Sequence, residues 1–323
     1  EYTYLMKVTG FTIVRNAIKF DYPIVEAITS ILPLCDEFVV AVGNSEDRTL
    51  ELIKSISSPK IRIIETTWDD SLRKGGRVLA VETDKAFAAI KPDTDWAFYI
   101  QADEVIHEKY HPVILETMKK WNNDKNVEGL LFNYTHFYGS YDYVGDSRKW
   151  YKHEIRIIKY NSTICSFRDA QGFRKGNKLI RVKPVNASVF HYGWVKPPEL
   201  QQKKQKHFNK MWHNDEWMKK NVPDVEAFDY SQIDSLALYT GTHPKVMEQR
   251  INNKNWQFTF DPTKKKFSFK TRLLYYIEKL TAWRIGEYKN YKIIICVVIN
   301  ILIGVGIWIY LNQPQLSSVN KTM

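Results

Sequence analysis

The sequence predicts an α/β fold, a mixed sheet with flanking helices, followed by a C-terminal membrane helix. Three observations lead to this prediction. Strand-like and helix-like runs alternate over residues 6–100 with short connections. One of the strand-like runs ends abruptly in the acidic pair Asp103-Glu104. The chain then reaches an almost wholly apolar stretch, residues 293–311.

Each run in the first hundred residues has its own signature. We expect strands at 6–16, 38–42, 61–64 and 96–100 and helices at 23–34, 49–56 and 77–90. Pro23 stands near the start of the first helix, where a missing N–H costs no hydrogen bond. A polar turn, 43–49, closes the second strand. Regular alternation of this kind is typical of a parallel sheet covered by helices.

Beyond residue 125 the alternation is lost. Further strands are expected at 127–132 and 155–158, and 199–220 has the pattern of a single polar helix. Between the two strands lies a stretch rich in aromatic residues, 134–151. Such rings either fill a core or form a platform for the face of a sugar, and the sequence leaves both interpretations open.

The chain carries a formal net charge of +11 over 323 residues. A basic balance fits nucleic acid, an anionic membrane or phosphorylated ligands. Zinc-finger spacing, an RNA-binding signature and a basic zipper region are all absent from the sequence, so we expect no nucleic-acid partner. The three cysteines are widely spaced and form no CxxC, which argues against a zinc site or a disulfide framework.

The C-terminal quarter combines a basic region with an apolar run. In 246–292, Lys and Arg are interleaved with large apolar residues, which suits either a helix on an anionic membrane surface or an amphipathic helix that covers the domain. A helix over 293–311 would span about 28 Å, close to the roughly 30 Å hydrocarbon core. We therefore expect one membrane span and a short tail, 312–323. The more basic preceding flank places the large domain, 1–245, in the cytoplasm.

The order of these parts resembles a family 2-type glycosyltransferase of the GT-A fold, a Rossmann-like nucleotide-diphospho-sugar transferase sheet. Arg15-Asn16 looks like the family's opening segment, 38–49 like its second strand and Asp-Gly-Ser-x-Asp-x-Thr turn, and Gln101-Ala-Asp-Glu104 like its Asp-x-Asp metal motif. The last motif is most similar to the lipopolysaccharide-core β-glucosyltransferase-like branch, which reads Asp-Ala-Asp-Glu. The resemblance covers roughly residues 6–200.

The resemblance implies a divalent cation, Mn²⁺ or Mg²⁺, that neutralises the departing nucleoside diphosphate, and a carboxylate that takes the acceptor's proton. The implied catalytic base is Asp169, with Glu154 as the alternative, and the implied metal ligands are Asp103, Glu104 and His191. The implied donor-binding residues are Arg15, Asn16, Asn44, Asp47, Gln101, Asp103, Arg156 and Lys175.

Two departures from the family pattern bear on this site. The acid that commonly contacts the nucleobase is replaced by Val42 or Gly43, and the first acid of Asp-x-Asp is Gln101. An amide adds no charge, so metal affinity is expected to be weaker unless Glu104 supplies the missing carboxylate.

The resulting expectation is a membrane-anchored, metal-dependent, inverting hexosyltransferase of cell-envelope polysaccharide synthesis. Its donor would be a nucleotide sugar and its acceptor a glycan or a lipid-linked sugar at the membrane surface. A non-catalytic, membrane-anchored sugar-binding or scaffold protein is the alternative that the lost acids favour. A nucleotidyltransferase is less favoured, because the turn Arg15-Asn-Ala-Ile-Lys19 lacks the Gly-rich loop of that class.

Overall fold

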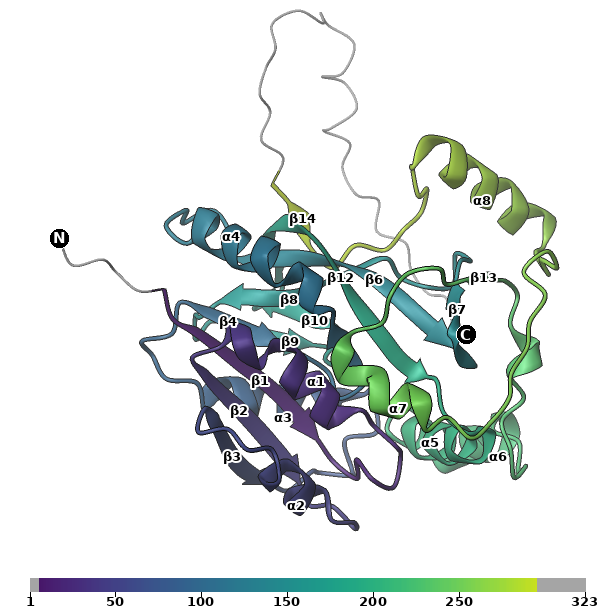
Figure 1. Ribbon diagram of the computed structural model, residues 1–323, viewed down its shortest axis with the longest axis horizontal. Helices are drawn as coiled ribbons and strands as arrows, with labels where there is room; N and C mark the ends of the chain where they lie inside the picture. The colour runs from purple at the N-terminus through teal and green to yellow at the C-terminus, as the bar shows by residue number, and fades with distance from the viewer. Residues whose placement is uncertain (1–5, 295–323) are drawn as a thin grey trace, which may run out of the picture.

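The computed structural model describes residues 6–294 (Figure 1). Its centre is a mixed sheet in the order β13-β7-β6-β8-β4-β1-β2-β3, with β12 paired to β5, β6 and β14. The strands of this sheet are β1 (Val8–Val14), β2 (Glu37–Gly43), β3 (Ile61–Thr66), β4 (Trp96–Tyr99), β5 (Glu104–Ile106), β6 (Gly129–Tyr138), β7 (Ser140–Gly145), β8 (His153–Lys159), β12 (Arg181–Trp194), β13 (Leu236–Leu238) and β14 (Lys292–Ile293). A separate small sheet contains β9 (Ile164–Phe167), β10 (Gly172–Lys175) and β11 (Lys178–Leu179).

The first half of the chain forms the parallel part of the sheet, as predicted. Strand β1 pairs in parallel with β2 and β4, and β2 with β3. Helices α1 (Ile24–Ile31), α2 (Thr49–Lys54) and α3 (Arg77–Ala88) connect these strands. Because parallel strands all run the same way, the segments that follow β1, β2 and β4 meet at one edge.

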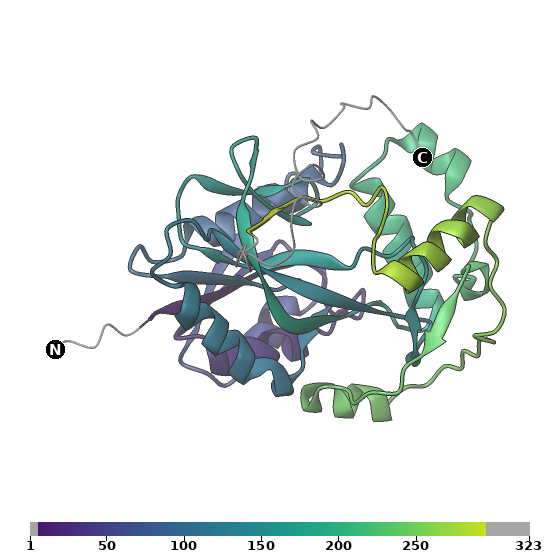
Figure 2. The same cartoon turned by 90° about the horizontal axis from the view of Figure 1, so that it is seen from above.

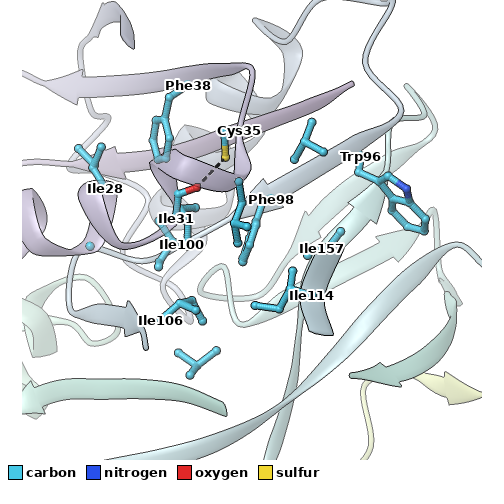
Figure 3. Close-up of a cluster of buried hydrophobic side chains, with 14 of the residues drawn as sticks. Ile28, Ile31, Cys35, Phe38, Trp96, Phe98, Ile100, Ile106, Ile114 and Ile157 are labelled. Carbon is cyan, nitrogen blue, oxygen red and sulfur yellow. Dashed lines mark hydrogen bonds between the residues drawn. The ribbon is translucent and has the colours of Figure 1, made fainter. Parts of the chain in front are cut away.

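Both faces of this sheet are buried, which explains why its strands are almost continuously apolar. Side chains alternate: Phe38 and Val40 of β2 face the core on the α1 side, whereas Val39 and Ala41 face the core on the α3 side. Figure 3 shows the first of these cores, in which Phe38 and Phe98 from the sheet pack beside Ile28 and Ile31 of α1.

Strand β12 organises the second half of the molecule. It pairs in parallel with β6 and antiparallel with β5, so that His191 lies opposite both His136 of β6 and Glu104 of β5. Residues that are far apart in the sequence therefore meet in the middle of one sheet, next to the end of β4.

Several elements differ from the prediction. Helix α4 (His111–Trp121) was not expected. The polar helix expected at 199–220 is two helices, α5 (Pro198–Lys210) and α6 (Asp215–Asn221), because the Asn214 side chain accepts a hydrogen bond from the Trp217 N–H and starts a new helix.

The α-helices of the basic region 246–292 are the short helix α7 (Glu248–Asn252) and helix α8 (Phe269–Thr281). The expected span at 293–311 lies outside the described residues except for its first two, and Ile293 pairs with Val182 of β12. Within residues 6–294, no helix has both the length and the apolar character needed to cross a membrane.

Candidate active site

A pocket of about 390 Å³ opens at the carboxyl edge of the parallel strands. It lies where ligands bind in open α/β sheets. The end of β1, the segment after β4, the β9–β10 turn, β12 and α5 all contribute to its wall. Five of the predicted site residues line this one pocket: Arg15, Gln101, Asp103, Asp169 and His191.

The Asp103 carboxylate lies in the pocket wall next to a lysine and a histidine. Its Oδ2 atom accepts a hydrogen bond from Lys204 Nζ at 2.9 Å and lies 3.8 Å from His191 Nε2. Burial alone would raise the pKa of Asp103, but the charge and the hydrogen bond of the Lys204 ammonium outweigh it and hold the pKa well below its usual range. Asp103 is therefore a carboxylate at any physiological pH.

The hydrogen bonds of His136 decide which nitrogen of His191 faces Asp103. His136 Nε2 lies 2.8 Å from the Tyr151 carbonyl oxygen, which can only accept, so this nitrogen carries the proton. Burial lowers the pKa of His136 well below its usual value, so the ring is neutral and its Nδ1 is an acceptor. His191 Nδ1, at 3.2 Å, must then donate to it. Because burial also lowers the pKa of His191, its Nε2 presents a lone pair to Asp103.

This pair of acceptors fits a cation. Asp103 Oδ2 and His191 Nε2 face each other with no proton between them, and the neighbouring residue is Gly193. A Cβ atom there would lie only 2.6 Å from Asp103 Oδ2 and 2.7 Å from His191 Nε2, so glycine keeps the space open. A carboxylate paired with a neutral imidazole suits a transition metal such as Mn²⁺, whereas Mg²⁺ would use the carboxylate together with phosphate and water oxygens. In the described part of the chain no three His, Cys, Asp or Glu side chains gather as a metal cluster.

The structure corrects the roles predicted for Glu104 and Arg156. Arg156 donates to Glu104 through Nε at 2.8 Å and through Nη2 at 2.7 Å, and both side chains are almost fully buried. Tyr134 Oη and the backbone N–H of Gln101 also donate to the Glu104 carboxylate, at 2.7 and 3.1 Å. Glu104 and Arg156 thus satisfy each other behind the pocket, and neither lines it.

Asp169 lies at the tip of the β9–β10 hairpin and lines the pocket. Both of its neighbours, Arg168 and Ala170, have positive φ angles, 57° and 62°, which side chains other than glycine rarely adopt. Gln101 Nε2 donates to the Ala170 carbonyl oxygen at 3.2 Å and ties this turn to the end of β4. Burial raises the pKa of Asp169 above that of an ordinary aspartate.

Glu154, the alternative base, does not line the pocket. Its Oε1 accepts a hydrogen bond from Gln171 Nε2 at 2.7 Å, and the side chain is buried under the hairpin. Burial, only partly offset by Arg156, raises the pKa of Glu154 to about 8. This group is therefore a neutral acid at pH 7, and Asp169 is the carboxyl group that can reach a substrate.

Trp68 explains the missing acid at the end of β2. A Cβ atom on Gly43 would lie 2.3 Å from the indole Nε1 of Trp68, so the ring packs directly on this glycine. Trp68 lines the pocket, and the Arg15 guanidinium lies 5.6 Å from its ring centre. Arg15 is in turn held by Asp70, at 2.6 Å. An aromatic face and a cation therefore lie side by side in the pocket wall, next to the end of β2.

The other predicted donor residues support the rim or lie elsewhere. Three of them accept hydrogen bonds from backbone N–H groups through their side-chain oxygens: Asn16 from Glu46 at 2.7 Å, Asn44 from Trp68 at 3.1 Å, and Asp47 from Thr49 at 3.0 Å. They fix the loops that carry Arg15 and Trp68 and do not line the pocket. Lys175 is exposed at the far end of β10, where its Nζ lies 3.6 Å from Glu128 Oε1.

Sequence reasoning missed Trp68, His136 and Lys204. Lys204 is one of several lysines in the polar helix α5, and nothing in its local sequence distinguishes it. It is nevertheless buried with Gln201 and Gln202 on the inward side of the helix, where its ammonium also donates to the Gly193 carbonyl oxygen at 2.9 Å. Of the aromatic stretch 134–151, Tyr151 reaches the pocket.

Comparisons with known proteins give a limited picture. No family model matches the chain, and no curated protein matches it. Among solved structures, S. aureus TarS 1–349 is 13% identical over 62% of this chain and 64% of that chain, with a TM-score of 0.35. The same TarS fragment in complex with UDP is 18% identical over 42% of this chain and 37% of that one, at 0.31.

Glucosyl-3-phosphoglycerate synthase from Mycobacterium tuberculosis, in complex with Mn²⁺, UDP and phosphoglyceric acid, is 20% identical over 41% of this chain and 43% of that chain, at a TM-score of 0.27. A 4-diphosphocytidyl-2C-methyl-D-erythritol synthase from Anaerococcus prevotii is 10% identical over 48% and 70%, at 0.31. Likenesses of this size do not identify a function.

Proposed function

We propose that the protein is a glycosyltransferase that moves a hexose from a nucleotide-sugar donor to an acceptor hydroxyl, with inversion. The observation that supports this proposal most is the convergence of Asp103, His191 and Asp169 on one pocket at the carboxyl edge of a parallel sheet. Such a transfer requires two things: side chains that can bind a cation, here Asp103 and His191, and a separate carboxyl group that lines the pocket, here that of Asp169.

The donor would lie along the pocket wall with its base near Trp68 and its diphosphate near Arg15. An aromatic face accepts a nucleobase by stacking, and a guanidinium suits phosphate oxygens. Asp103 and His191 would hold a divalent cation, which when bound neutralises the charge that develops on the departing nucleoside diphosphate. Lys204, hydrogen-bonded to Asp103 at 2.9 Å, adds a fixed positive charge at the same place.

Asp169 would act as the general base. The acceptor oxygen attacks the anomeric carbon, the bond from that carbon to the phosphate oxygen breaks, and the nucleoside diphosphate leaves with the electron pair. The proton of the acceptor hydroxyl passes to the Asp169 carboxylate. A raised pKa makes the Asp169 carboxylate a stronger base than that of an ordinary aspartate. The acceptor would be a glycan or a lipid-linked sugar.

A second candidate is binding of a nucleotide sugar without turnover. The contact between Lys204 and Asp103 favours it, because an ammonium already satisfies the carboxylate that a metal would need. In that case Lys204 and Arg15, without a metal ion, would neutralise the diphosphate.

One experiment separates the two. A panel of nucleotide sugars is titrated by calorimetry and assayed for release of nucleoside diphosphate, with and without Mn²⁺ or Mg²⁺. The wild type is compared with Asp103→Asn and with Asp142→Asn, a control whose carboxylate is exposed on β7. Metal-dependent release that Asp103→Asn abolishes and Asp142→Asn retains supports the transferase. Binding without release, unaffected by chelator, supports the second candidate, and no binding to any donor overturns both.

A further inference from the structure

Helix α8 carries its apolar side on the outside of the molecule. The exposed fractions of Phe269, Leu273, Tyr276 and Leu280 are 86%, 54%, 54% and 86%. Their spacing of four, three and four residues places them on one face of the helix. Trp283, just beyond the helix end, is also 57% exposed. Figures 1 and 2 show α8 at the periphery, away from β1, β2 and β3.

The inward side of α8 includes the half-buried Leu274 and Ile277 and is held in place by charged and hydroxyl groups. Glu278 pairs with Arg148 at 2.5 Å, with Lys152, and with Arg284 at 3.8 Å. One turn earlier, Tyr275 Oη donates to Asp146 at 3.0 Å. An ordinary surface helix buries its apolar stripe and turns its charges to water. Here the arrangement is reversed, so the fold fixes α8 with its apolar stripe facing outward.

Cations border the apolar stripe on both sides. At about 100° per residue, Lys270 falls on one side and Arg272 and Lys279 on the other. All three are exposed, and in the part of the chain that the structure describes none of them pairs with a carboxylate. Two more exposed lysines, Lys264 and Lys266, precede the helix. An apolar stripe with a basic rim is the pattern of a helix that lies in the interface of an anionic bilayer.

We propose that α8 docks in the plane of an anionic membrane surface. Phe269, Leu273, Tyr276 and Leu280 enter the boundary between headgroups and acyl chains, while the bordering cations contact lipid phosphates. The basic rim favours lipid over a second apolar protein surface, because the cations complement a negative surface. The position of the site in the chain agrees: α8 ends at Thr281, and the sequence turns almost wholly apolar at 293–311. The proposal does not depend on the chemistry of the pocket.

The test uses the full chain with Cys165 and Cys296 replaced by Ser and a polarity-sensitive fluorophore on Leu280→Cys. Cys35 is buried and stays in place. The same label on Glu216→Cys, on exposed α6, serves as the control. With vesicles that contain about a third phosphatidylserine, we expect a blue shift at position 280, quenching by spin-labelled lipids, and neither effect at position 216. Phosphatidylcholine vesicles should give a much smaller shift.

A charge-reversal variant tests the rim separately. Lys270→Glu/Arg272→Glu/Lys279→Glu should remove the part of the shift that depends on phosphatidylserine, whereas the matched reversal Lys203→Glu/Lys219→Glu/Lys220→Glu on α5 and α6 should retain it. Three outcomes overturn the proposal. The first is the absence of a blue shift in anionic vesicles that have bound the protein. The second is a blue shift without lipid that grows with protein concentration, which indicates that a second copy covers α8. The third is a blue shift without lipid that does not depend on concentration, which indicates that the chain's own C-terminal segment covers it.

Discussion

The Nδ1 atoms of His136 and His191 lie 3.2 Å apart, and this contact orients the lone pair of His191 towards Asp103. The relationship depends on a third group, the Tyr151 carbonyl oxygen. It accepts a hydrogen bond from the only N–H of the neutral His136 ring, so His136 Nδ1 is left as an acceptor. A partner of this kind, behind a metal-binding histidine, commonly fixes both the tautomer and the ring orientation.

We therefore expect His136→Gln to weaken Mn²⁺ binding about 10- to 100-fold. The amide cannot reproduce both ring contacts, so His191 is free to turn its N–H towards Asp103. The measurement is calorimetric titration of Mn²⁺ in the presence of a nucleoside diphosphate. His213→Gln is the control, since His213 stacks on Trp217 and does not line the pocket. Equal Mn²⁺ affinity in wild type and His136→Gln would show that His136 does not position His191.

Asp169→Asn should lower kcat by about 10²- to 10⁴-fold and leave the Kd for the donor within about twofold, because the base acts on the acceptor alone. The pH profile gives a second readout. Burial raises the pKa of Asp169 from 3.8, and a base works only when ionised, so kcat/KM should rise with pH through a midpoint above 3.8. A variant that keeps full kcat, or a wild-type profile that falls as pH rises through that range, would contradict the assignment.

The parallel half of the fold could be predicted because its strands are buried on both faces and stand out as apolar runs. Asp103, Asp169 and His191 could be proposed from chemistry. The acidic pair could not be assigned correctly from composition, because the backbone turns at 102–103, where the Glu104 N–H donates to the Gln101 carbonyl oxygen at 3.1 Å. Asp103, in the turn, lines the pocket, whereas Glu104, the first residue of β5, is buried and meets Arg156.

Contacts made between distant segments could not be predicted. Lys204 reaches Asp103 across 101 positions of the sequence, and His136 reaches His191 across 55. Gly43 seemed a lost acid, and only the packing of Trp68 against it gives the reason. Strands and helices can be predicted from local sequence patterns. These contacts cannot, because they depend on where the fold places β12 and α5 relative to the end of β4.

Glu104→Gln should destabilise the protein strongly and leave the intrinsic metal affinity of the folded fraction unchanged. Removing one charge of a buried ion pair leaves the Arg156 guanidinium uncompensated, which costs about 3–5 kcal/mol. Urea unfolding followed by circular dichroism measures the loss of stability, and Mn²⁺ titration of the folded variant measures the affinity. Normal stability with abolished Mn²⁺ binding would instead restore Glu104 as a metal ligand.

Glu154→Gln should stabilise the protein relative to wild type increasingly as pH rises from about 5 to 8. The wild-type carboxyl group has a pKa of about 8 when folded, against a reference value of 4.5. The native state therefore holds a proton that the unfolded state has lost, and wild-type stability decreases across this interval, whereas the amide does not titrate. Thermal unfolding of both proteins at several pH values measures the difference, and the change should leave donor binding unaltered because Glu154 does not line the pocket. A difference in Tm that stays constant over the same interval would mean that Glu154 is already ionised in the folded protein.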